Sequence, residues 1–294
     1  MAELAIGLQR QVRSIVEIGK PKVVMLIVFT AYVGMLLAYP SAIDWPVVLA
    51  GCLGIGLVAA AGAAVNHVVD ARIDRLMART SRRPLASDLM EARFALGWAA
   101  VWGITGTAIL LAWVNALTAV LTLIAMLGYA IVYTVYLKHR TPQNIVWGGA
   151  AGAAPPLLGW AAATGEVSIE GLLLFLIIFL WTPPHFWPLA IAKVDEYRRA
   201  SVPMLPVTHG IEATKHQILL YTVAMVAVTI APWAIGMSGW LYGLAAVALG
   251  GEYLRRSWRL YRSPRHAGAM GLFGYSIVYL ALLFLALLLD HYLL

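Results

Sequence analysis

The sequence predicts an all-α integral membrane protein with nine transmembrane helices, and three observations support this prediction. Of the 294 residues, 62% are hydrophobic and only 12% are charged, whereas a soluble domain averages about 25% charged residues. The apolar residues gather in nine runs, and a helix needs about 20 such residues to cross a bilayer. Lys and Arg are confined to alternate connections between the runs.

The nine candidate spans follow one another along a single domain that covers residues 1–294. The connections between the third and fourth runs and between the seventh and eighth are very short. Losing one of these hairpins would leave seven spans without changing the orientation of the others. The candidate spans are 23–40, 46–65, 94–113, 115–137, 145–163, 171–192, 217–236, 239–254 and 271–289.

The basic residues predict the orientation of the chain. The N-terminal arm, residues 1–22, and the connections after the even-numbered spans carry Lys and Arg, whereas the other connections contribute only Asp44, Glu166 and Glu170. Cytoplasmic loops carry an excess of basic residues, so we expect the N-terminus in the cytoplasm and the C-terminus outside. The net charge of +7 then reflects topology, and we expect no nucleic-acid partner.

The single cysteine and the N-terminal sequence indicate which kinds of site and which cellular location to expect. Cys52 stands alone, which excludes an intrachain disulfide and a metal cage built from cysteines. The N-terminus has neither the pattern of a secretory signal nor that of an organelle leader. We therefore expect the cell (inner or plasma) membrane of a bacterium or archaeon, with the lipid bilayer as the surroundings.

The first of two long cytoplasmic loops, residues 66–93, opens with NHVVDARIDR. If the second span continues as a helix, Asn66, Asp70 and Asp74 advance by about 40° per step and share one face. An amide oxygen and two carboxylates form the all-oxygen surface that suits Mg²⁺. The competing interpretation is a solvated helix end, where the aspartates pair with nearby arginines for a few tenths of a kcal/mol each.

Arginines follow the acidic stripe in the same loop, at positions 75, 79, 82 and 83. Guanidinium groups match the geometry of phosphate oxygens in a bidentate way. An acidic stripe followed by a basic loop is the arrangement that binding of Mg²⁺ and a diphosphate requires.

The second long loop, residues 193–216, offers Asp195, Glu196, Arg198 and Arg199. Two acidic loops on one side of the membrane could hold two Mg²⁺ ions that bridge one diphosphate. The alternative is an interfacial helix end whose charges lie among lipid headgroups. Lys138, after the fourth span, is either an ordinary cytoplasmic lysine or a further diphosphate ligand.

These residues carry a resemblance to a known family. NHVVDARIDRLMARTSRRPL resembles the N-x-x-x-D-x-x-x-D signature of the intramembrane aromatic prenyltransferase superfamily, which includes the ubiquinone and menaquinone prenyltransferases. Three later segments resemble its heme branch, the protoheme IX farnesyltransferases or heme O synthases. They are YLKHRTPQNIVWGGAAGAAPPLLGWAA, WTPPHFWPLAI and DEYRRASVPMLPV, and the likeness runs from about residue 20 to the last span.

The resemblance implies nine helices around a central cavity, with the two cytoplasmic loops capping it. It implies transfer of the farnesyl group of farnesyl diphosphate to the vinyl group of heme B, with addition of water, to give heme O and diphosphate. Heme B is then a substrate, and a downstream heme A synthase is a possible partner. The implied catalytic and Mg²⁺-binding residues are Asn66, Asp70, Asp74 and Asp195; the implied diphosphate ligands are Arg79, Arg82, Arg83, Lys138 and Arg198 or Arg199.

The second loop departs from the superfamily pattern. Quinone-type members read D-x-x-x-D there, whereas Arg199 stands four residues after Asp195 in this chain. Either Glu196 substitutes as a ligand of the second Mg²⁺, or that ion is held less fully.

Three residues are candidates for the heme pocket. His185 lies within the sixth span beside Trp181, and an ionisable group at that depth suggests a function, although a hydrogen-bonded structural histidine is an equal alternative. His67 points about 100° away from the Asn–Asp face, so it is better placed for heme than for Mg²⁺.

Two other functions are compatible with the same residues. A quinone-type prenyltransferase would use the same scaffold with an aromatic acid as acceptor. A transporter would bind a coupling cation at Asn66, Asp70 and Asp74. The position of these residues at the membrane exit disfavours a transporter, whose sites usually lie near the midplane.

Overall fold

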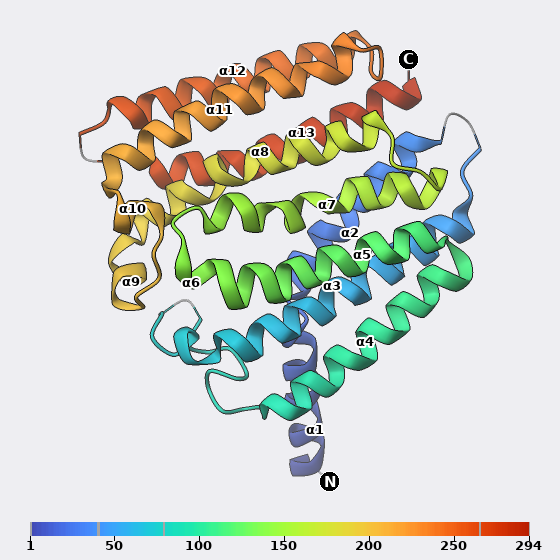
Figure 1. Cartoon of the computed structure of the whole chain (residues 1–294), viewed down its shortest axis with the longest axis vertical. Helices are drawn as coiled ribbons and strands as arrows, with labels where there is room; N and C mark the ends of the chain where they lie inside the picture. The colour runs from blue at the N-terminus through green and yellow to red at the C-terminus, as the bar shows by residue number, and fades with distance from the viewer. Residues whose placement is uncertain (1, 40–41, 79, 265, 294) are drawn as a thin grey trace.

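The computed structural model describes residues 2–39, 42–78, 80–264 and 266–293, which form helices and short connections without a strand (Figure 1). The all-α prediction is confirmed. In chain order the elements are α1 (Ala2–Ile18), α2 (Pro21–Ala38), α3 (Trp45–Asp74), α4 (Ala92–Trp113), α5 (Ala116–Leu127), the π-helix η1 (Gly128–Leu137), α6 (Lys138–Arg140), α7 (Asn144–Thr164), α8 (Ile169–Ala192), α9 (Val194–Arg199), α10 (Leu205–Thr208), α11 (Gly210–Ala234), α12 (Trp240–Arg262) and α13 (Ala269–Leu293).

Seven helical segments of the described chain are long and apolar enough to cross a membrane: α2, α3, α4, the continuous α5–η1 segment, α8, α11 and α13. Helices α7 and α12 occupy the positions of the other two expected spans. Helix α7 is rich in Gly, Ala and Pro, and α12 is charged from Glu252 onward, which lowers their hydropathy. The multi-pass membrane character is confirmed, while the count of nine spans and their orientation stay predictions.

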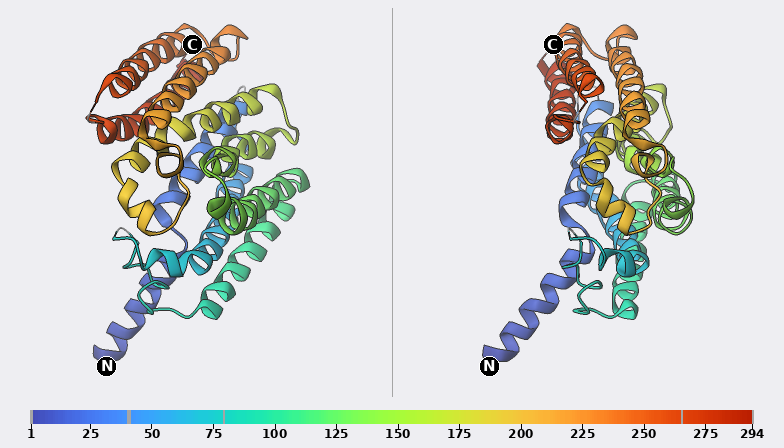
Figure 2. Two further views of the ribbon diagram at one scale, coloured as in Figure 1. Left: turned by 60° about the vertical axis from the view of Figure 1, so that its left-hand side comes forward. Right: turned by 90° about the vertical axis from the view of Figure 1, so that its left-hand side faces the viewer.

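The long helices lie side by side with roughly aligned directions, and their connections gather at two opposite ends (Figure 1). Helix α2 packs on α7, α7 on α8, α8 on α11 and α13, and α3 on α4. One end carries α6, α9, α10 and the connection 75–91; we call it the site end, and the right view of Figure 2 faces it.

Close backbone contact holds α2 against α7. A Cβ atom at Gly159 would lie 1.9 Å from the carbonyl oxygen of Ala31, and one at Gly34 would lie 2.1 Å from that of Pro156. Only glycine allows this approach, and small residues serve the same purpose at many helix contacts in membranes.

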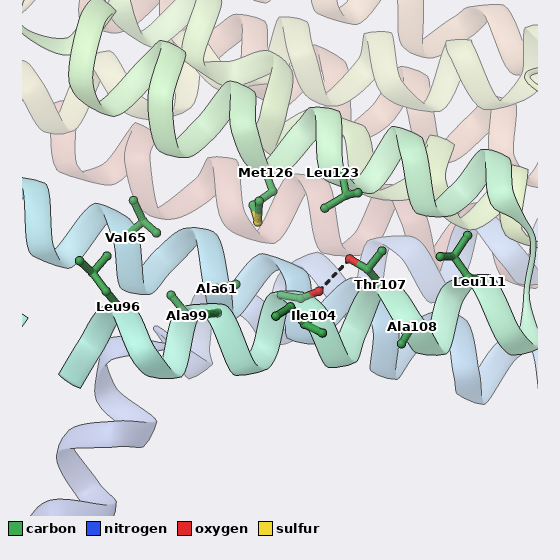
Figure 3. A pocket seen from close by; sticks show the side chains of 12 residues that line it. Ala61, Val65, Leu96, Ala99, Ile104, Thr107, Ala108, Leu111, Leu123 and Met126 are labelled. Carbon is green, nitrogen blue, oxygen red and sulfur yellow. Dashed lines mark hydrogen bonds between the residues drawn. The ribbon is translucent and has the colours of Figure 1, made fainter. Parts of the chain in front are cut away.

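An apolar hollow of about 620 Å³ lies between α3, α4 and α5 (Figure 3). Its lining includes Ala61 and Val65 of α3, Ile104 of α4, and Leu123 and Met126 of α5. Helices α3, α4 and α5 form one side of the bundle (Figure 1), so this hollow is not the central cavity that the resemblance implies. The central cavity stays a prediction.

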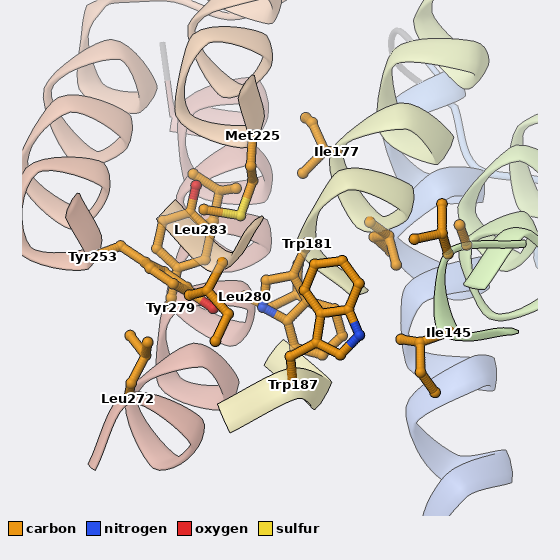
Figure 4. Packing of buried hydrophobic residues seen from close by; sticks show 14 of the residues in the cluster. Ile145, Ile177, Trp181, Trp187, Met225, Tyr253, Leu272, Tyr279, Leu280 and Leu283 are labelled. Carbon is orange, nitrogen blue, oxygen red and sulfur yellow. The ribbon is translucent and has the colours of Figure 1, made fainter. Parts of the chain in front are cut away.

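The largest buried cluster joins α8 to α11, α12 and α13 (Figure 4). Trp187, Tyr253 and Tyr279 are fully buried there, and the ring of Tyr253 meets that of Tyr279 edge-on with centroids 5.1 Å apart. Aromatic side chains bury large apolar areas, so this cluster fixes the C-terminal helices on α8.

Asp290 ties the last helix to the start of α12. Its buried carboxylate accepts hydrogen bonds from the backbone N–H groups of Gly239 and Tyr242. The first N–H groups of a helix have no partner within that helix, and a negative charge at this end is favourable. A side chain of α13 therefore caps the N-terminal end of the neighbouring helix α12.

We predict that Asp290→Ala lowers the free energy of unfolding by about 1–3 kcal/mol, because buried N–H groups lose their acceptor. Asp44→Ala is the matched control, since Asp44 is exposed and caps its own helix through the N–H of Val47. Thermal unfolding of the detergent-solubilised protein measures both. Equal losses for the two variants would contradict the role of Asp290.

Candidate active site

Helix α3 continues without a break to Asp74, so Asn66, Asp70 and Asp74 lie on one face of one helix, as predicted. They are only 3%, 3% and 4% exposed. The interpretation as a solvated helix end is therefore wrong. Buried carboxylates are costly unless they are paired and hydrogen-bonded, and each of these has a cationic or amide partner.

Cations from two other segments pair with the carboxylates. The Nζ atom of Lys138 lies 2.6 Å from Oδ1 of Asp70. The Nη1 atom of Arg83 donates to both carboxylate oxygens of Asp74, at 2.9 and 2.8 Å. The structure thus brings together four residues predicted from sequence to bind Mg²⁺ or diphosphate.

Asn66 joins these groups into one network. Its Nδ2 atom donates to Oδ2 of Asp70 at 2.9 Å and to Oγ1 of Thr134 at 3.0 Å. The Thr134 hydroxyl in turn donates to the carbonyl of Tyr129 at 2.8 Å. Both residues lie on η1, the ten-residue π-helix, a form that occurs frequently at functional sites.

Lys20 is the charged residue of the site that sequence analysis missed. Its ammonium donates to Oδ1 of Asn66, and to the hydroxyl of Tyr129 at 3.2 Å. It precedes Pro21, the first residue of α2, and adopts a left-handed φ of 50°, which is costly for a residue other than glycine. Burial, followed by the charge of Arg83, lowers the pKa of Lys20 to about 7.

The sequence offered one signal for Lys20. A lysine directly before the proline that starts the first span is expected at the membrane surface. The cytoplasmic ends of the other spans lie at the same depth. The basic charge of Lys20, however, looked like that of any cytoplasmic residue.

The remaining arginines of the first loop are less informative. Arg82 is exposed, and Arg79 lies outside the described residues. Their assignment to the diphosphate stays a prediction.

The second loop lies at the site end but makes its own ion pairs (Figure 1). Asp195 is exposed and its carboxylate lies 2.6 Å from Arg198, while Glu196 pairs with Lys193 at 2.9 Å; Arg199 is exposed. Among the residues that the structure describes, no hydrogen bond or ion pair joins these side chains to Asp70 or Asp74. The second metal site stays a prediction.

The end of helix α3 has a donor set that fits Mg²⁺. This ion is usually held by one or two carboxylates, water and substrate phosphates, and Asn66, Asp70 and Asp74 supply three oxygen-bearing groups. The described residues contain no group of three or more His, Cys, Asp or Glu side chains placed to hold a metal. A Mg²⁺ ion here would use the carboxylates of Asp70 and Asp74, the Asn66 oxygen and oxygens of a substrate.

The heme-pocket candidates have different surroundings. The Nδ1 atom of His185 lies 2.6 Å from Oγ of Ser276, and its ring stacks between those of Trp181 and Phe273, with centroids 4.1 and 4.9 Å away. His67 is 2% exposed, and neither ring nitrogen has a hydrogen-bond partner within the described chain. The structure supports a packing role for His185 and leaves the functional prediction for His67 open.

Sequence comparison identifies relatives along almost the whole chain. Residues 27–288 match the UbiA prenyltransferase family. Protoheme IX farnesyltransferase 1 of Pseudomonas fluorescens is 58% identical over 282 residues, which cover 96% of this chain and 94% of the relative. Protoheme IX farnesyltransferase of Thioalkalivibrio sulfidiphilus is 55% identical over 276 residues, with 94% and 91% covered.

Solved structures share the fold at low sequence identity. A digeranylgeranylglyceryl phosphate synthase superposes with a TM-score of 0.82 at 19% identity, covering 96% of this chain and 99% of that one. A UbiA homologue from Archaeoglobus fulgidus, bound to DMAPP and Mg²⁺, superposes with a TM-score of 0.69 at 17% identity, covering 93% and 99%. The family match and the close relatives together show that the chain belongs to the UbiA prenyltransferase family.

Proposed function

We propose that this protein transfers the farnesyl group of farnesyl diphosphate to a vinyl group of heme B, with addition of water, giving heme O and diphosphate. The observation that carries the proposal is the 55–58% identity to protoheme IX farnesyltransferases over almost the whole chain. The buried cluster of carboxylates and cations at the end of α3 supports it, because this chemistry begins with the departure of a diphosphate.

Asn66, Asp70 and Asp74 would hold Mg²⁺ in this reaction. The family homologue bound to DMAPP and Mg²⁺ supports metal dependence. Bound Mg²⁺ would neutralise charge on the diphosphate oxygens. The two carboxylates are buried on one face of α3, so the helix itself would fix the direction from which the diphosphate approaches.

Arg83 and Lys138 are the cations placed to bind the diphosphate, and Lys20 joins them. Each now contacts a proposed metal ligand, and each could donate to a phosphate oxygen once the substrate is present. Donors aimed at developing charge are the largest contribution that such a site makes to rate. The same donors would hold the diphosphate away from bulk water, which would otherwise hydrolyse the substrate.

The bond changes in the proposed reaction balance as follows. The bond between C1 of the farnesyl group and the diphosphate oxygen breaks, and the electron pair leaves with the diphosphate. The terminal vinyl carbon of heme B bonds to C1, and the hydroxyl of one water bonds to the other vinyl carbon. The proton of that water is released.

The second loop would complete the site by adding ligands to those at the end of α3. Asp195, or Glu196 in its place, would hold a second Mg²⁺, and Arg79, Arg82 and Arg198 or Arg199 would bind the diphosphate. The support is the position of α9 at the site end (Figure 2, right). The exposed ion pairs of Asp195 and Glu196 are weak, since such pairs contribute about 0–1 kcal/mol, so these side chains can change partner at little cost.

We further propose nine transmembrane helices around a central cavity, with the N-terminus and both loops in the cytoplasm of a bacterial or archaeal cell. The charge pattern of the connections supports this orientation. His67, whose ring nitrogens have no hydrogen-bond partner among the described residues, is a better candidate than His185 for contact with heme. A downstream heme A synthase would consume the product.

The direct test is an acceptor competition with the purified protein. We predict farnesyl transfer from farnesyl diphosphate to heme B, and none to 4-hydroxybenzoate, because close relatives act on protoheme IX by name. Mass spectrometry of the extracted products distinguishes the two. Prenylated 4-hydroxybenzoate without heme O would assign the protein to the quinone-type branch instead.

We predict that Asp70→Asn lowers kcat by about 10²–10³-fold, the loss typical when a site loses one group that stabilises developing charge. Asp88→Asn is the matched control, because Asp88 lies in the same loop, is exposed and pairs only with Arg75 among its described contacts. Single-turnover rates at saturating Mg²⁺ measure the effect. A wild-type rate for Asp70→Asn would remove this residue from the mechanism.

Lys20→Ala should lower kcat/KM for farnesyl diphosphate by about 10- to 100-fold, because a hydrogen bond to a charged group contributes about 1.5–3 kcal/mol. Lys22→Ala is the control, since Lys22 is exposed two residues further on and has the same charge. Thermal unfolding of both variants separates folding from catalysis. If the two variants react equally fast, Lys20 has no part in binding the diphosphate.

A further inference from the structure

Helix α1 has three distinct faces. At about 100° per residue, Ser14 and Ile18 share one face, Val12 and Val16 a second, and Arg10 and Arg13 lie on a third. Ser14 and Ile18 are buried against the bundle, whereas both valines are 52% exposed. The bundle therefore covers only one of the two non-basic faces, and an apolar stripe is left without a protein partner in the described structure.

The direction of α1 differs from that of the other long helices. It runs across them and extends beyond the edge of the bundle, as Figures 1 and 2 both show. If the other long helices cross the bilayer, a helix across their direction lies in the plane of the membrane.

The neighbours of α1 indicate its depth. A hollow of about 320 Å³ separates Gln11 and Ile15 of α1 from Glu91, Arg93 and Phe94 at the start of α4. Beyond Arg93, α4 contains no charged residue, so this is the level at which α4 enters the apolar layer. Charged residues followed by an apolar segment mark the boundary between water and hydrocarbon.

The far end of α1 reaches the same boundary. Ile18 belongs to a buried cluster flanked by Trp98 and Trp102, and tryptophan is enriched at the membrane interface. The bilayer that surrounds α2 and α4 must therefore continue beneath α1. Amphipathic helices at this level bury their apolar face by about 5–10 Å and keep the polar face in the headgroups.

We propose that α1 is an interfacial anchor, a helix that lies in the lipid headgroup layer at the site end. Val12 and Val16 face the acyl chains, and Arg10 and Arg13 face the phosphates of lipid headgroups. Only Gly19 separates Ile18 from Lys20, so the anchor also fixes the backbone that carries Lys20 to Asn66. The partner surface is the lipid itself, and the proposal does not depend on which substrate the site accepts.

Quenching of a fluorophore in lipid nanodiscs tests the proposal. The native Cys52 is replaced in Cys52→Ala, and an environment-sensitive probe is attached to Val16→Cys. Glu17→Cys is the matched control, because Glu17 is the next residue, is exposed and lies on the polar side. Farnesyl-transfer activity of the labelled proteins shows that both remain folded.

We expect a quencher attached to lipid acyl chains to lower the emission of the probe at position 16 at least about twofold more than at position 17, with aqueous iodide giving the reverse order. Equal iodide quenching at both positions would place α1 in water and overturn the proposal. Protection of position 16 from both quenchers would show that protein, such as a second copy of the chain, covers the stripe, and would overturn it equally.

Discussion

Two buried carboxylates on α3 determine how the site end is assembled. Burying an ion costs several kcal/mol even after the protein relaxes. Asp70 and Asp74 are therefore stable as ions only if other segments of the chain provide partners. The partners come from the segment after η1, through Lys138, and from the first loop, through Arg83. The fold of three separate segments thus depends on the charge of one helix face, and Asn66 extends that dependence to the N-terminal arm through Lys20.

The charges of this cluster also suit the proposed substrate. With Lys20 protonated, three cations face two carboxylates, which leaves one positive charge. One Mg²⁺ adds two more, and a diphosphate ester carries roughly three negative charges near neutral pH, as expected when each phosphate ionises with a pKa no higher than about 6. On binding, the cation–carboxylate pairs of Arg83 and Lys138 would be exchanged for cation–phosphate pairs, and the carboxylates would hold the metal. The cluster would thus change from a net charge of +1 without substrate to neutrality with Mg²⁺ and the diphosphate bound, which favours binding of an anionic ligand.

Sequence patterns predicted the part of the site that lies on one helix. The spacing of Asn66, Asp70 and Asp74 follows from helix geometry, and a guanidinium a few residues later is within reach of the same stripe. Lys20 and Thr134 could not be found in this way, because their contacts join segments that are distant in the chain. Nor does any local pattern distinguish the π-helix η1 from the α-helix that its apolar residues predict. For the fold, apolar length predicted the positions of the nine long apolar helices. It did not predict helix α1 in the N-terminal arm, whose direction across the others depends on packing at Ile18.

The acidic residues at the end of α3 and those of the second loop differ in their exposure to water. Asp70 and Asp74 are buried, so their positions are set by folding, and removing a partner leaves a charge that costs several kcal/mol. Asp195 is solvated, and its pair with Arg198 contributes little. A buried half of a site can orient a substrate only along a direction fixed in advance, whereas a solvated half can adjust to it. If the second loop holds a metal ion as proposed, Arg199, which stands where quinone-type members have the second aspartate, falls in the solvated part of the site, where water could replace a protein ligand at the smallest energetic cost.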